Sequence, residues 1–143
     1  MANVKSAIID QQLVQGGPYG ITSLTVFPPA GQQAVTASIG DVIYLGRIPA
    51  GNDVNGLTIL NEAVASLTGK VGYAPVKSSD GPSMVDDYWF TAGTDFSAAT
   101  RKRSDAFPIR FEYDVYIIMT IAGAGISNKK VLAIAELNTV GTK

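Results

Sequence analysis

Glycine and proline break this chain into short segments. There are 15 glycines and seven prolines among 143 residues, and helical periodicity is hard to find between them. The segments that remain are rich in Val, Ile, Thr, Tyr and Phe, which favour strands. Short strands separated by frequent turn residues are typical of sandwiches and barrels. The sequence therefore predicts an all-β fold, an antiparallel β-sandwich, and its length fits a single domain.

The clearest strand signal is IRFEYDV at residues 109–115. Apolar and charged side chains alternate there, with Ile109, Phe111, Tyr113 and Val115 facing inward and Arg110, Glu112 and Asp114 facing outward. Such alternation is typical of a half-buried antiparallel strand. An apolar run over 116–122 follows, in which Ile117 and Ile118 can face the same core only if an oligomer covers one of them. After the turn GAGISN, residues 131–137 are expected to return as the second strand of a C-terminal hairpin, with inward-facing Val131, Ala133 and Leu137.

Weaker signals place further strands at residues 21–27, 34–39, 42–48, 56–65, 70–76 and 88–92. The segment 78–84, SSDGPSM, is expected to be a loop because Asp-Gly and Pro both break strands. The segment 96–102 is either a loop or a short helix. We expect residues 1–20 to form an extended N-terminal arm and residues 21–143 to form the single sandwich domain.

The charge balance gives the chain no general attraction to nucleic acid or to anionic membranes. Eleven Lys and Arg residues oppose 12 Asp and Glu residues, for a formal net charge of −1. With no cysteine and no histidine, the chain lacks thiolate chemistry and the commonest general base and zinc ligand. The start has no signal-peptide pattern, and the longest apolar run, 115–122, is too short to cross a bilayer. We expect a soluble protein made in a cytoplasm, with no nucleic-acid or membrane partner.

The acidic residues form no recognisable catalytic or metal site. Asp86 and Asp87 could bind a cation together with Asp80 or Asp95, but calcium needs about six to eight oxygen ligands, so a solvated loop is favoured. The three glutamates lie in expected strands and form no pair of the kind that glycosidases use. A small hydrolase, which would need carboxylates meeting in a cleft, stays a minor alternative. We predict no catalytic, cofactor-binding or metal-binding residue and no cofactor.

Two clusters are candidates for binding another macromolecule. Arg101, Lys102 and Arg103 are expected on a solvated loop, with contact to an acidic protein surface as the next interpretation, because three charges would bind phosphates only weakly. Tyr88 and Trp89 belong to DDYWF, which holds the only Trp of the chain. Such aromatic residues lie most often in a core, next in protein interfaces, and third on ligand-binding surfaces.

Five sequence segments follow one another along about residues 39–137: DVIYLGRIPAG, NGLTILNEAVA, TGKVGYAP, YWFTAGTDFSAATRKRS and FPIRFEYDVYIIMTIAGAG. Their order and their turns resemble the decoration, or cement, proteins of tailed bacteriophages. The resemblance implies a jelly-roll-like sandwich that binds the major capsid protein on the outside of an icosahedral shell. Such a protein stabilises the shell against the pressure of packed DNA and catalyses no reaction. It belongs to the virion exterior and is made in the host cytoplasm.

On this hypothesis, three segments are candidates for protein interfaces. They are the N-terminal arm with its apolar anchors, the aromatic pair and the basic cluster, that is, Ile8, Ile9, Leu13, Val14, Tyr88, Trp89, Arg101, Lys102 and Arg103. A homo-oligomer is expected, most simply a two-fold dimer that hides the apolar C-terminal hairpin. The alternative is a carbohydrate- or receptor-binding module of a phage tail or fibre. That alternative requires an exposed aromatic platform, Tyr88 and Trp89, in a concave face.

Overall fold

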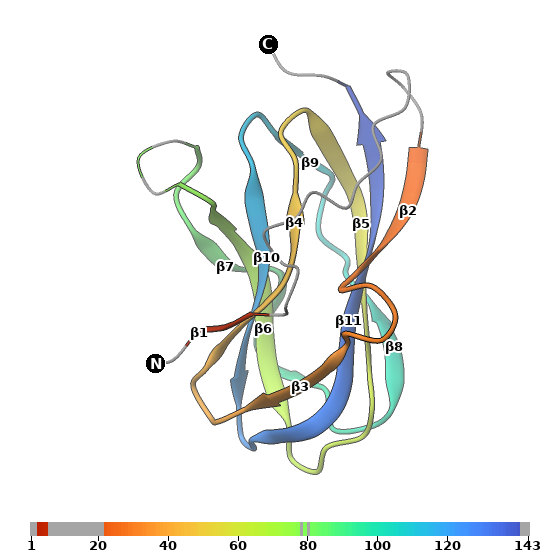
Figure 1. Cartoon of the computed structure of the whole chain (residues 1–143), viewed down its shortest axis with the longest axis vertical. Helices are drawn as coiled ribbons and strands as arrows, with labels where there is room; N and C mark the ends of the chain where they lie inside the picture. Colours follow the sequence, from red (N-terminus) through yellow and green to blue (C-terminus); the bar gives the residue numbers. More distant parts are fainter. Residues whose placement is uncertain (1–2, 6–21, 78, 80, 141–143) are drawn as a thin grey trace.

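The computed structural model describes residues 3–5, 22–77, 79 and 81–140. In this part of the chain every regular element is a strand, and the strands form two sheets that pack face to face (Figure 1). The all-β sandwich predicted from the sequence is therefore confirmed. All neighbouring strands are antiparallel except for one parallel pair at the N-terminal end.

The first sheet has five strands. In spatial order they are β1 (Asn3–Lys5), β4 (Val42–Ile48), β10 (Val115–Ala122), β6 (Thr68–Pro75) and β7 (Val85–Asp95). β1 is the described part of the N-terminal arm, and it pairs in parallel with the start of β4. β7 therefore lies at one edge of this sheet and β1 at the other.

The second sheet has six strands. Its main path is β2 (Thr22–Phe27), β11 (Ile126–Thr139), β5 (Asn52–Asn61) and β8 (Thr100–Arg103), while β3 (Ala34–Ala37) pairs with β11 and β9 (Ile109–Phe111) pairs with β5. The chain crosses repeatedly between the sheets, for example from β4 to β5 and from β5 to β6. Together with β4-β10-β6-β7 in the first sheet, this path makes the sandwich jelly-roll-like.

The main core lies between the sheets, where alternate residues of each strand meet. In β5, Leu57 and Ile59 are fully buried, whereas Thr58 and Leu60 are half-buried on the outer face. β10 is buried on both faces: Ile117 joins the main core, and Ile118 joins a second apolar cluster on the opposite face. Both side chains are buried within a single chain, so neither needs an oligomer to cover it.

β4 contains a bulge, next to which a glycine lies close to the second sheet. The register against β10 shifts so that Gly46 lies opposite Ile117 and Tyr44 lies opposite Ile118, which leaves Leu45 as the extra residue. A Cβ at position 46 would run into the ring of Phe27, which comes from β2 in the other sheet. The glycine therefore allows a close approach of β4 to a core side chain.

The predicted C-terminal hairpin is wrong. β10 pairs with β4 and β6 in the first sheet, whereas β11 pairs with β2, β3 and β5 in the second. Because β10 has a neighbour on each side, no edge remains for β11. The turn between them connects the sheets instead, and Gly123 there takes a φ of 76° beside the backbone carbonyl of Ser66. The apolar hairpin that motivated the dimer prediction does not exist.

The predicted continuous strand over 109–115 is also wrong. β9 ends at Phe111 in the second sheet, and β10 begins at Val115 in the first, so the chain changes sheets between them. Tyr113 lies in this crossing and is 52% exposed instead of facing inward. The other residues predicted to face inward are buried, except for half-buried Ile109; the buried ones are Phe111, Val115, Val131, Ala133 and Leu137.

Three other boundaries differ from the prediction. The segment 96–102 is neither wholly a loop nor a helix, because β8 begins at Thr100. The aromatic strand expected at 88–92 is the middle of the longer strand β7, and β5 begins at Asn52, before the predicted start. The loop expected at 78–84 does lie between β6 and β7, with residues 78 and 80 outside the described residues.

Candidate functional site

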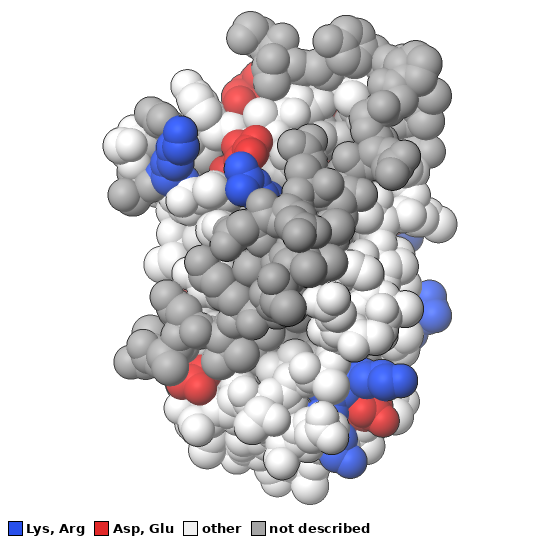
Figure 2. Space-filling view, in the orientation of Figure 1, with Lys and Arg blue, Asp and Glu red and all other residues white. Residues whose placement is uncertain are grey.

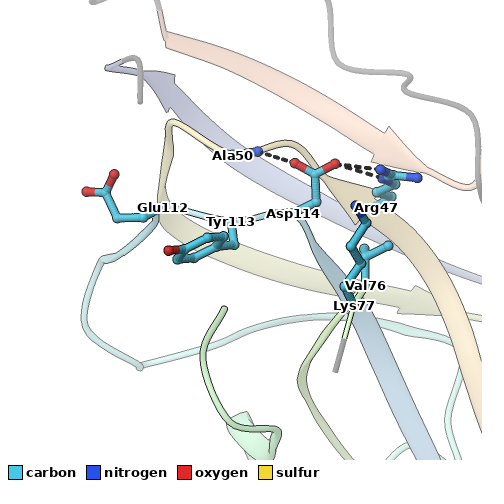
Figure 3. A pocket seen from close by; sticks show the side chains of 7 residues that line it. All are labelled: Arg47, Ala50, Val76, Lys77, Glu112, Tyr113 and Asp114. Atoms are coloured by element: carbon cyan, nitrogen blue, oxygen red, sulfur yellow. Dashed lines mark hydrogen bonds and ion pairs between the residues drawn. The ribbon is translucent and has the colours of Figure 1, made fainter. Parts of the chain in front are cut away.

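A polar recess lies at one end of the sandwich, where three segments meet. It has a volume of about 270 Å³ and is lined by Arg47, Ala50, Val76, Lys77, Glu112, Tyr113 and Asp114 (Figure 3). These residues come from β4 and the turn after it, from the two positions directly after β6, and from the crossing between β9 and β10. The volume is slightly below the roughly 300–1,000 Å³ of typical small-molecule sites. The recess has room for about one side chain.

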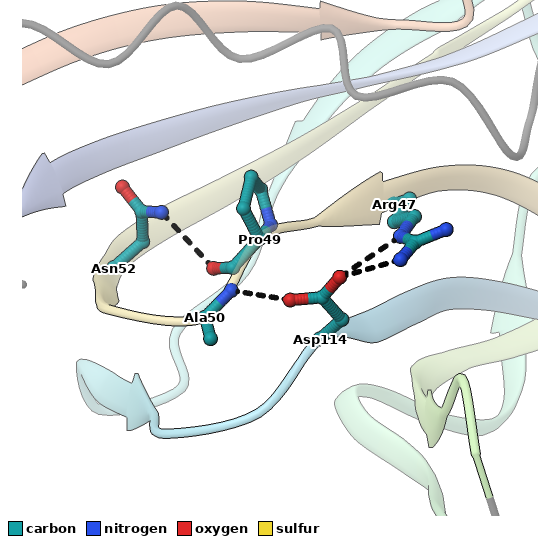
Figure 4. A network of polar contacts seen from close by, with 5 residues as sticks. All are labelled: Arg47, Pro49, Ala50, Asn52 and Asp114. Carbon is teal, nitrogen blue, oxygen red and sulfur yellow. Dashed lines mark hydrogen bonds and ion pairs between the residues drawn. The ribbon is translucent and has the colours of Figure 1, made fainter. Parts of the chain in front are cut away.

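Asp114 is the polar centre of this recess. Arg47 donates to its Oδ2 atom from Nε at 3.1 Å and from Nη2 at 2.6 Å, and the Ala50 backbone N–H donates to Oδ1 at 2.8 Å (Figure 4). Next to it, the Asn52 side chain donates to the carbonyl of Pro49 at 3.0 Å. The carboxylate therefore fastens the turn after β4 to the start of β10.

The surroundings of Asp114 keep it ionised at neutral pH. Burial alone raises its pKa, but the hydrogen bonds from Arg47 and Ala50 and the charges of Arg47 and Lys77 outweigh burial, so the pKa is lowered. Both carboxylate oxygens already accept hydrogen bonds, and Figure 3 shows Glu112 turned away from them. A low pKa and occupied oxygens suit a structural ion pair and do not suit a general acid or base.

The remaining acidic residues singled out in the sequence do not converge. Asp86 forms an ion pair with Lys70 at 2.8 Å, and Asp95 accepts from the Ser97 backbone N–H at 2.8 Å. Asp86 and Asp95 lie near opposite ends of β7. Thr68 of β6 is opposite Asp95 and Tyr73 is opposite Val85, so the two carboxylates are separated by about 15 Å at the rise of β6. Within the described residues, no group of three or more Asp or Glu side chains could hold a metal ion. Asp80 lies outside these residues.

Trp89 belongs to the core, the first of the interpretations offered by the sequence. It is 5% exposed and makes edge-to-face contacts with Tyr73 at 5.9 Å and Phe111 at 6.4 Å between ring centroids. Tyr88 is half-buried and donates its hydroxyl to the carbonyl of Phe107 at 2.8 Å. The exposed two-ring platform required by the carbohydrate-binding alternative is thus not formed. Among the described residues, the exposed aromatic rings are those of Tyr113 and Phe107, the latter 85% exposed, which the sequence pattern did not identify.

The basic cluster lies on a strand and not on the predicted loop. Arg101, Lys102 and Arg103 belong to β8, where Arg101 and Arg103 are exposed on the outer face and Lys102 is half-buried. Arg103 forms an ion pair with Glu136 of β11 at 2.8 Å, so part of its charge is balanced within the chain. Ile8, Ile9, Leu13 and Val14 of the arm lie outside the described residues.

No protein-family model and no curated protein matches this chain. Two solved structures share its fold. A chain in the capsid of Ralstonia phage GP4 superposes with a TM-score of 0.72 at 16% identity, covering 99% of this chain and 100% of that chain. A chain in the capsid asymmetric unit of cyanophage Pam1 gives a TM-score of 0.58 at 15% identity, covering 90% of this chain and 92% of that one. Such low identities establish similarity of fold. The described residues contain no helix that is long and apolar enough to cross a membrane.

Proposed function

We propose that this chain is a structural protein of a tailed-phage virion that binds the outer surface of the icosahedral capsid and reinforces it. The observation that carries the proposal is the shared fold with a chain of the Ralstonia phage GP4 capsid, which extends over 99% of one chain and 100% of the other. The similarity of fold thus extends over almost the full length of both compared chains. The order of the sequence segments and their turns, which resembles decoration proteins, supports the same role.

The charge distribution supports a position on the outside of the shell. A protein that lines the inside faces packed DNA, where positive charge is favourable. This chain has a net charge of −1 and a pI of about 5.2. On the face in view, Figure 2 shows the Lys, Arg, Asp and Glu side chains of the described residues in small scattered groups of mixed sign. Such a surface suits contact with protein better than contact with DNA.

Reinforcement of a shell requires many repeated contacts and no reaction. Each contact can be modest, because copies bound across an assembled shell act together through multivalency. The partner is the major capsid protein, and a homo-oligomer, most simply a two-fold dimer, would join adjacent capsid subunits. The carboxylate of Asp114 is held by Arg47 and Ala50 and contributes rigidity at one end of the sandwich.

The receptor-binding alternative loses its main support. A hollow of about 460 Å³ between β7 and β8 does include Tyr88 and Trp89 in its lining. However, Trp89 is only 5% exposed, so its ring face cannot stack on a sugar.

Purified protein added to shells that lack it tests the proposal. The shells are sedimented through a sucrose gradient to measure bound protein, and heated with a DNA-binding dye to record the temperature at which they release DNA. We expect saturable binding and a higher release temperature, and no effect from an unrelated acidic protein of equal mass. Protein that ignores shells and instead binds tail tips or host glycans would refute the capsid role and support the alternative.

A further inference from the structure

β2 is an edge strand of the second sheet with unusual exposed apolar residues. Among the described strands it pairs only with β11, over residues 22–27. Leu24 is 71% exposed and Val26 is 40% exposed, and both lie on the outer face, since Phe27 faces the core. Val26 lies opposite Ile134, which is half-buried on the same face. Exposed apolar side chains therefore run along the margin of the sheet.

The other described edge strands carry features that prevent pairing with another chain. Natural edges are protected by charged residues, by irregular register or by being very short. β7 contains Asp86, Asp87 and Asp95 and has two register shifts against β6, and β8 carries three consecutive cationic residues. β3 has four residues, and β1 and β9 have three each.

β2 has none of these features. Its six residues, TSLTVF, include no charge, no proline and no glycine, and its register against β11 is uninterrupted. Alternating Leu, Thr, Val and Phe have high β-propensity. By the same physical criteria that make the other edges poor templates, β2 is suited to accept an additional strand.

A second copy of β2 is the strand that fits this edge best. Two antiparallel copies are related by a two-fold axis, so each residue meets a residue of the same uncharged segment and no like charges face each other. Leu24 and Val26 of one copy then lie beside the same apolar stripe of the other. The nearest charged side chains on this face, Arg103 and Glu136, form an ion pair with each other and therefore do not oppose this arrangement. The pair lies over Gly56, where a Cβ would collide with both side chains.

From this contrast among the edges, we infer that two copies of this chain associate through antiparallel pairing of their β2 strands, which joins the two second sheets into one continuous sheet. The inference deepens the proposed function, on which it rests for its purpose, by naming the contact between copies. It replaces the C-terminal hairpin, which the structure removed as a dimerisation surface.

Sedimentation equilibrium over a range of concentrations tests the contact. We expect the wild type to be a dimer and the double variant Leu24→Lys/Val26→Lys to be a monomer, with a dissociation constant raised about tenfold or more by like charges placed opposite each other. Ile39→Lys and Met84→Lys are matched controls, since these apolar residues are 62% and 59% exposed away from β2. Circular dichroism verifies that every variant is folded. A monomeric wild type, a dimeric double variant, or controls that dissociate equally would overturn the inference.

Single cysteines give a second readout because the chain has none of its own. Four variants each carry one cysteine, at position 23, 24, 25 or 26. Under mild oxidation, at least one of them should form a disulfide-linked dimer, whereas the control Ile39→Cys should not. If none of the four forms more dimer than Ile39→Cys, the β2 contact is contradicted. Adding the wild type and each lysine variant to shells that lack the protein separates the proposal of β2 pairing from the proposal of capsid binding. Wild type that binds shells as a monomer refutes the β2 contact alone, and wild type that dimerises but ignores shells refutes the capsid role alone.

Discussion

Replacing Phe111 by alanine should destabilise the fold strongly, although β9 is only three residues long. The ring is 2% exposed and meets Tyr73 edge to face at 4.9 Å and 72°, with Trp89 at 6.4 Å on another side. The residue belongs to the backbone pairing of β9 with β5, in which Phe111 lies opposite Asn52. Core burial and the ring contacts both depend on this one side chain.

The expected loss in the free energy of unfolding is about 3–5 kcal/mol, because truncation removes buried surface and leaves a cavity. Of this, about 0.5–1.5 kcal/mol belongs to the edge-to-face contact with Tyr73. Tyr113→Ala is the matched control, two positions along the same sequence pattern. Its ring is 52% exposed, so the change should be within about 0.5 kcal/mol.

Equilibrium unfolding in urea at neutral pH measures both variants. Phe111→Ala should lower the midpoint with little change in slope, and Tyr113→Ala should leave the midpoint close to that of the wild type. Phe111→Leu, which keeps most of the volume, should fall between them. Equal midpoints for the two alanine variants would refute the assignment of Phe111 to the core and Tyr113 to the surface.

Two further variants test the polar recess and the β4 bulge. Asp114→Asn should cost about 1–3 kcal/mol at neutral pH, because it weakens the hydrogen bonds from Arg47 and Ala50. The pKa of Asp114 is lowered in the folded chain, so its contribution is complete above the unfolded pKa of about 3.9 and is lost as the pH falls through the folded pKa. Urea titrations of wild type and variant should therefore converge below about pH 4, and a constant difference would contradict the ion-pair account. Gly46→Ala should cost about 1–3 kcal/mol in the same assay, since its Cβ would overlap the Phe27 ring, and unchanged stability would show that the sheets can separate freely there.

Much of the fold could be predicted because strand signals are local. Alternation placed Phe111, Val131, Ala133 and Leu137 in the core, and turn residues placed the loop after β6. Strand pairing is not local. β10 and β11 are separated by a short turn, yet they belong to different sheets because β4 and β6 already occupy both sides of β10. Alternation assigns faces to a strand and gives no information about its neighbours.

The break at Tyr113 has a long-range cause of the same kind. Asp114 is held by Ala50 and Arg47, which are 64 and 67 residues away in the sequence, so the local pattern of IRFEYDV carried no sign of the interruption. Arg101, Lys102 and Arg103 form a strand because β5 offers them a partner, not because of their own propensity. The polar recess could not be predicted from the sequence, because its lining residues come from three segments that are far apart in the chain.

Electron cryo-microscopy of capsids incubated with the purified protein tests the central claim most directly. The account predicts added density on the outer surface of the shell, repeated with the icosahedral symmetry and matching the two-sheet sandwich, with copies lying across joints between capsid subunits. Shells without added protein should lack this density. Density confined to the inside of the shell or to the tail, or shells that remain bare at saturating protein, would contradict a role in reinforcing the capsid from outside.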